Sequence, residues 1–156
     1  MRRSVEACLE VGRGLRVLPV DTLHAVAEQA RHQHGTEHVV AVLDARMDEV
    51  YAAHLQWQNG QWHTASSPAL SAPEQVHVPE GWTVAGNAQA AYPTRLAPTA
   101  DHVVALPTAA ALLRLAPALL AAGQDVDASG ALPLYLRDKV AQTTAEREAL
   151  RMGKLA

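Results

Sequence analysis

Apolar side chains recur at helical spacing in the first part of the chain. Residues 4–16 carry them three and four positions apart, which predicts an amphipathic helix. A second helix is predicted over residues 21–34, because Asp21 is a favourable N-cap residue and Gly35 is typical of the position just beyond a helix. Two helices are therefore expected before any strand.

The hydrophobic pattern then changes to the spacing of strands. Residues 39–43 are continuously apolar, which is typical of a central strand buried on both faces, and residues 50–57 alternate as a strand does. Asn59 followed by Gly60 favours a two-residue hairpin turn, which would place two tryptophans opposite each other. The pattern predicts three antiparallel strands, the third ending near residue 66.

Beyond Pro68, short extended and helical segments alternate. Strands are predicted over residues 82–85 and 102–106, and a helix over residues 108–122 with Pro117 inside it. Three antiparallel strands followed by alternating helices and strands is the element order of a ribonuclease-H-like lobe, an α/β fold with a mixed sheet. This order predicts the fold class, but by itself it gives no function.

The composition is that of a globular domain with no strong charge. A chain of 156 residues, 49% of them hydrophobic, can bury a sizeable core, and its net charge of −3 gives no positive field to attract nucleic acid or membrane. The single cysteine, Cys8, cannot form an intramolecular disulfide, which fits a reducing compartment. No signal peptide is recognisable, and the longest apolar stretch, residues 109–122, is too short to span a bilayer. We therefore expect a cytoplasmic protein with no membrane segment.

Three acids stand where the first predicted strand ends. Asp44 follows the apolar run, and Asp48 and Glu49 follow within five residues. A carboxylate enzyme of this fold needs a second acid from another strand end, but the next strand runs into Asn87 and the one after it ends without an acid. Because Arg46 can also neutralise the acids, we interpret the segment as a structural strand-turn-strand. A metal-dependent hydrolase or peptidase that uses Asp44 and Asp48 is the alternative.

Other chemistry finds little support in the sequence. Three histidines, His32, His34 and His38, straddle a predicted helix end and its loop, where they are not expected to converge on a metal ion. The phosphate-binding motif GxxxxGK[ST] is absent. We expect no catalytic residue, metal or cofactor in this chain. A small module that contacts tRNA through C-terminal basic residues is a further alternative. Those residues are Arg137, Lys139, Arg147, Arg151 and Lys154.

Four sequence blocks resemble the TsaB (YeaZ) family, formerly labelled glycoprotease or M22 peptidase-like proteins. They are VAVLDARMDEVYAA at 40–53, LPVDTLHAVAEQA at 18–30, VAGNAQA at 84–90 and PLYLRDKVA at 133–141. The likeness extends in order over about residues 8 to 147. It implies an actin-like ATPase (ASKHA) fold built of two ribonuclease-H-like lobes. It also implies a role in making threonylcarbamoyladenosine in tRNA.

The resemblance also implies which subunit of the family's machinery is catalytic. In that family TsaD binds the metal and catalyses the reaction, whereas TsaB is a partner subunit without a functional active site. This chain is therefore expected not to be an enzyme. Its expected partners are a TsaD-type catalytic subunit and a TsaE-type ATPase, with tRNA contact at most indirect. The residues expected to have a structural role are Asp44, Arg46, Asp48, Glu49, Tyr135 and Arg137.

The sequence departs from the family pattern at its start. The IDTS-like strand and PGSFTGLR-like loop of a first lobe have no counterpart in this sequence. We therefore expect residues 1–16 to be the remnant of an interface helix, residues 17–141 to be the second lobe and residues 142–156 to be a polar tail. The resemblance implies that the first helix meets a partner, and an exposed apolar stripe favours a homodimer. The stripe is formed by Val5, Cys8, Leu9, Gly12 and Leu15.

Overall fold

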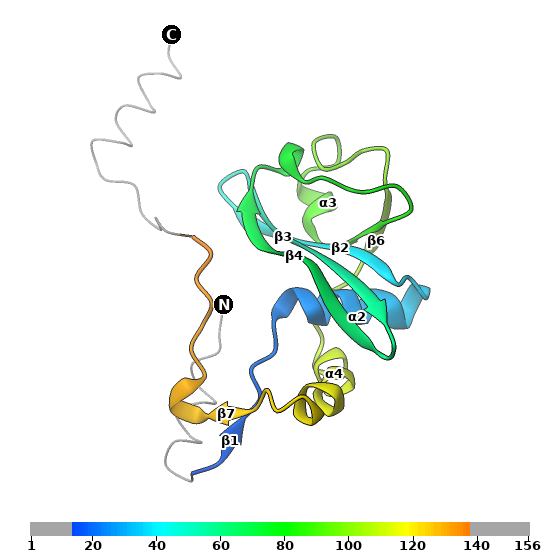
Figure 1. The fold of residues 1–156 in the computed structure, drawn as a ribbon. Coiled ribbons are helices and arrows are strands. Elements are labelled where there is room, and N and C mark those ends of the chain that lie inside the picture. Colours follow the sequence, from blue (N-terminus) through cyan, green and yellow to red (C-terminus); the bar gives the residue numbers. More distant parts are fainter. Residues whose placement is uncertain (1–13, 138–156) are drawn as a thin grey trace, which may run out of the picture.

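A five-stranded mixed sheet forms the centre of the molecule, which the computed structural model describes over residues 14–137. Three strands form an antiparallel meander, and two further strands continue the sheet in parallel with the central one (Figure 1). In spatial order the strands are β4 (Gln61–Ser71), β3 (Glu49–Gln58), β2 (His38–Arg46), β5 (Thr83–Gly86) and β6 (Asp101–Val104). This is the predicted mixed sheet.

Helices cover the sheet unequally. One face packs against α2 (Thr22–His34), and α4 (Ala109–Ala121) lies beside α2 (Figure 1). The other face is covered by the short α3 (Ala88–Ala91) and by the loops around it, including a 3₁₀ turn at Pro73–Gln75.

A small second sheet lies apart from the first. It pairs β1 (Arg16–Val17) with β7 (Val126–Asp127), which precedes a 3₁₀ turn at Ala128–Gly130.

The central strand β2 separates two hydrophobic cores. Val39 and Ala41 belong to the core under α2, whereas Val40 and Val42 belong to the core on the opposite face. All four side chains are fully buried. The prediction of a strand buried on both faces is confirmed, because consecutive side chains of a strand point to opposite sides of the sheet.

Local signals set the ends of α2 and of the hairpin. The side chain of Asp21 accepts a hydrogen bond from the N–H of Leu23 at 2.7 Å, and Gly35 takes a left-handed conformation just beyond the helix. Asn59 and Gly60 both have positive φ, as the predicted turn requires. The two tryptophans, Trp57 and Trp62, are opposite each other, with ring centroids 5.4 Å apart. These sequence predictions are confirmed.

Two predictions need correction, and one strand pair was not predicted. The first predicted helix does not extend to residue 16, since Gly14 forms a turn with φ +65° and Arg16 enters β1. Arg16 is held there by ion pairs to Asp125 and Asp127. The third strand of the meander does not end near residue 66 but continues to Ser71, because an edge strand tolerates a proline. The pair β1–β7 was not predicted, since two residues give no periodic signal.

Candidate functional site

The acids at the end of β2 lie on a tight turn. Arg46, Met47 and Asp48 all have positive φ, between 56° and 65°. The carboxylate of Asp44 accepts a hydrogen bond from the N–H of Arg46 at 2.9 Å and so stabilises this unusual backbone. The structure therefore has a strand-turn-strand at this position.

Each of the three acids forms an ion pair with a different arginine. Each carboxylate is therefore neutralised separately. The pairs are Asp44–Arg46 (3.2 Å), Asp48–Arg95 (3.0 Å) and Glu49–Arg137. Arg95 also pairs with Glu74, which connects the turn to the loop after β4. The sequence indicated Arg46 as a partner, but the two distant arginines follow only from the fold.

Asp44 lies at the carboxyl ends of the parallel strands β2 and β5, where ligands commonly bind in open α/β sheets. Its hydrogen-bond partners there are the side-chain amide of Asn87 and the phenol of Tyr92. Its N–H donates to the side-chain oxygen of Asn87 at 3.0 Å, and the hydroxyl of Tyr92 donates to its carboxylate at 3.2 Å. Burial, followed by the bond to Asp44, raises the pKa of Tyr92, so this hydroxyl stays protonated. The residue that follows β5 is thus an asparagine, and not the second acid that carboxylate catalysis needs.

The last described segment reaches back to the same turn. The guanidinium of Arg137 donates to the carbonyl oxygen of Ala45 at 3.3 Å and lies 3.2 Å from the sulfur of Met47. Tyr135, by contrast, is 79% exposed and lies outside this cluster. Arg137 therefore contacts the turn, and the structural role expected for Tyr135 and Arg137 stays a prediction.

Metal binding and membrane insertion find no support within residues 14–137. No group of three or more histidine, cysteine or acidic side chains in this part of the chain could hold a metal ion. None of the described helices has the length and hydrophobicity to cross a bilayer. Of the residues expected on the interface stripe, Leu15 is half exposed. Val5, Cys8, Leu9 and Gly12 lie outside the described residues.

A buried carboxylate on α2 was not recognised from the sequence. Glu28 is 1% exposed and binds two arginines and a tryptophan. Its carboxylate accepts from Arg31 at 2.9 and 3.0 Å, from Arg114 at 3.0 Å and from the indole N–H of Trp62 at 3.1 Å. Burial raises the pKa of Glu28, but these hydrogen bonds outweigh it and hold the pKa below its usual value. The network fastens α2 to α4 and to β4.

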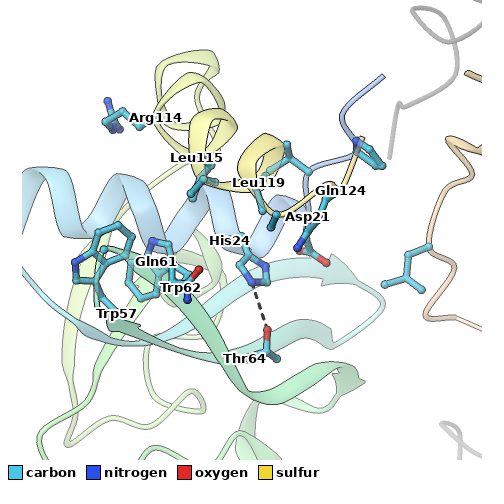
Figure 2. Close-up of a pocket in the computed structure, with 16 residues that line it drawn as sticks. Asp21, His24, Trp57, Gln61, Trp62, Thr64, Arg114, Leu115, Leu119 and Gln124 are labelled. Carbon is cyan, nitrogen blue, oxygen red and sulfur yellow. Dashed lines mark hydrogen bonds between the residues drawn. The ribbon is translucent and has the colours of Figure 1, made fainter. Parts of the chain in front are cut away.

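A groove of about 500 Å³ opens beside this network, between α4, the start of α2 and β4 (Figure 2). Trp62, Leu115 and Leu119 give it apolar walls. His24 lies in its middle, with Nε2 3.3 Å from the hydroxyl oxygen of Thr64 and with Nδ1 buried without a hydrogen-bond partner. Burial lowers the pKa of His24 and the nearby Asp21 only partly opposes this, so the imidazole is neutral at pH 7.

Comparison with known proteins places the chain in a family. The family model described as TsaD, tRNA N6-adenosine threonylcarbamoyltransferase, matches residues 4–145. The tRNA threonylcarbamoyladenosine biosynthesis protein TsaB of Escherichia coli is 35% identical over 143 residues, and that of Haemophilus influenzae is 30% identical over 150. The chain belongs to the TsaB (YeaZ) family. The matched region covers 85% of this chain but only 62% and 61% of the length of these two relatives.

Solved structures agree with this TsaB (YeaZ) assignment. YeaZ from Pseudomonas aeruginosa has a TM-score of 0.77 and 38% identity, over 85% of this chain and 65% of that one. A second structure is described as an uncharacterized protein with similarity to peptidase YeaZ from the same organism. It has a TM-score of 0.71 and 41% identity, over 78% of this chain and 59% of the other. The predicted α/β fold class is confirmed.

Proposed function

We propose that this chain is a non-catalytic partner subunit in the formation of threonylcarbamoyladenosine in tRNA, and that it acts by associating with a TsaD-type protein. The pathway is supported by the names of its TsaB relatives. The non-catalytic role is supported by one observation: the acids at the β2–β3 turn are each neutralised by a separate arginine. Carboxylate catalysis needs acids that converge on a metal or divide acid and base roles.

Asparagine substitutions test this role. Asp44→Asn together with Asp48→Asn keeps the side-chain shapes, so tRNA modification in a mixture reconstituted with the TsaD-type and TsaE-type proteins should stay within about twofold of wild type. Modified nucleoside is measured by mass spectrometry, and binding to the TsaD-type protein by pull-down. Modification that is abolished while binding persists would show that the acids are catalytic. The purified chain alone, with divalent metal and peptide or RNA substrate, should show no turnover.

We further propose that association uses the first 16 residues, with tRNA contacted only through the partner. Leu15, at the end of this stretch, exposes half of its side chain. The chain alone is then expected to form a homodimer, since apolar stripes tend to be covered by a neighbour. Leu9→Lys with Leu15→Lys should give a monomer by light scattering. The control Leu113→Lys, on the exposed side of α4, should leave the dimer intact. A wild-type monomer contradicts this proposal.

A further inference from the structure

The strand β4 presents an unprotected edge. It is the outermost strand of the sheet, and its residues 63–67 are all exposed. Over eleven residues it contains no Asp, Glu, Lys or Arg, the side chains that ordinarily discourage pairing at an edge. Pro68 interrupts the edge only in its second half. The regular stretch before the register shift that follows Thr64, residues 61–64, is therefore open to pairing with another strand.

The register of the hairpin shows which groups face that edge. Gln61 follows a two-residue turn and so forms a hydrogen-bonded pair with Gln58, and such pairs alternate along an antiparallel ladder. The N–H and C=O groups of Trp62 and Thr64 consequently point away from β3. Their side chains point toward α2, where Trp62 contacts Glu28 and Thr64 contacts His24. A strand paired with Trp62 and Thr64 would direct its own opposing side chains over the groove.

The lining of the groove is suited to those side chains. Its walls on α4, Leu115 and Leu119, are apolar. The guanidinium of Arg114 is occupied, because it donates to Glu28 and to Gln29, at 2.8 Å in the second case. Asp21 is a carboxylate that no ion pair engages within the described chain. The groove is therefore suited to apolar groups and a cation, and it offers no free positive charge to a phosphate.

We propose that this groove binds an extended peptide segment of a partner protein, which adds a strand to β4. Backbone hydrogen bonds to Trp62 and Thr64 supply affinity, and alternate apolar side chains against Leu119 supply specificity. A basic side chain of the peptide pairs with Asp21.

A short synthetic peptide tests the proposal. Its sequence is leucine-threonine-leucine-threonine-lysine, blocked at both ends, so that the leucines and the lysine share one face. On titration of the whole chain, followed by nuclear magnetic resonance, the amides of Trp62 and Thr64 should exchange with solvent at least about tenfold more slowly at saturation. A peptide with serine in place of leucine should bind at least about tenfold more weakly. N-methylation of both leucines should also abolish the protection, because it removes the donors that face β4.

Matched variants separate the backbone from the groove. Thr64→Pro removes the outward N–H and should weaken binding at least about tenfold, whereas Thr64→Val retains it and should bind normally. Leu119→Asp should weaken binding to a similar degree, and Leu120→Asp, on the exposed side of the same helix, should not. The second pair of variants still tests the proposal if Thr64→Pro fails to fold.

Several outcomes would overturn the proposal. One is the absence of saturation up to about 1 mM peptide. Another is equal binding of the N-methylated peptide, which would mean that the groove holds side chains without strand pairing. Protection of the Trp62 and Thr64 amides without peptide would also contradict it. If that protection depends on protein concentration, the occupant is a second copy. If it disappears on removal of residues 138–156, the occupant is the chain's own C-terminal segment.

Discussion

Neutralising the buried carboxylate of Glu28 is expected to cost more than any other conservative change on α2. Glu28→Gln keeps the shape of the side chain but removes the charge that binds Arg31 and Arg114. It also turns an N–H donor toward groups that are themselves donors. The network joins α2, α4 and β4, so its loss should loosen all three elements together.

The magnitude follows from how the two arginines are exposed. Removing one partner of a buried ion pair typically costs about 3–5 kcal/mol. The side chains of Arg31 and Arg114 are 30% and 27% exposed, so water can solvate part of their freed charge. We therefore expect the lower end, about 3 kcal/mol in the free energy of unfolding. For a domain of this size that corresponds to a fall of roughly 10 °C in Tm.

The pH dependence gives a stricter test of the same reasoning. The pKa of Glu28 is lower in the folded state than its ordinary value of 4.5. The carboxylate therefore contributes its full stabilisation above the unfolded pKa and loses it as pH falls through the folded pKa. The difference in Tm between wild type and Glu28→Gln should be constant near pH 7. It should narrow only at acidic pH, where the wild-type side chain becomes protonated.

Thermal unfolding followed by circular dichroism from neutral to acidic pH measures both quantities. Glu80→Gln, an exposed change remote from the network, serves as the control and should shift Tm little at any pH. Two results would refute the reasoning. One is a Glu28→Gln protein as stable as wild type at pH 7. The other is a loss of stability that persists unchanged into acid, since that would point to packing rather than charge.

Two glycines give further predictions. Gly86→Ala should prevent stable folding or lower Tm severely, because an added Cβ would lie 1.8 Å from the carbonyl oxygen of Val42 in the adjacent strand. The control Gly130→Ala meets nothing closer than 3.6 Å, so equal stability of the two variants would contradict this. Gly60→Val should cost about 1 kcal/mol or more, because it forces a β-branched residue to φ +80°. An unchanged midpoint in chemical unfolding would mean that the turn relaxes to another type.

The exposed surface of α4 carries large apolar side chains. Leu113 and Leu120 are 74% and 52% exposed, and the helix carries a single charged residue, Arg114, that is turned inward. The helix is therefore held by the Glu28 network as well as by its few buried side chains. This explains why disrupting that network is expected to affect a helix whose own apolar contacts are limited.

The sequence alone was enough to predict the elements that have local causes. The N-cap at Asp21, the left-handed residue at Gly35 and the hairpin turn at Asn59 and Gly60 all act within a few residues. The continuous apolar run of β2 predicted its burial on both faces. The absence of a second acid after β5 was also readable from the sequence, because the strand order fixes which residues meet at a sheet edge.

Only the tertiary structure could reveal contacts between residues distant along the chain. Arg95 and Arg137 reach the β2–β3 turn from 47 and 88 residues away, and Glu28 meets Arg114 across 86 residues. No spacing rule links such residues, since their approach depends on how helices and loops pack on the sheet. The groove beside β4 has the same origin. Its lining comes mainly from α2, β4 and α4, with Trp57 of β3 and Leu134 near the end of the described chain, and each element taken alone has an ordinary amphipathic or edge-strand pattern.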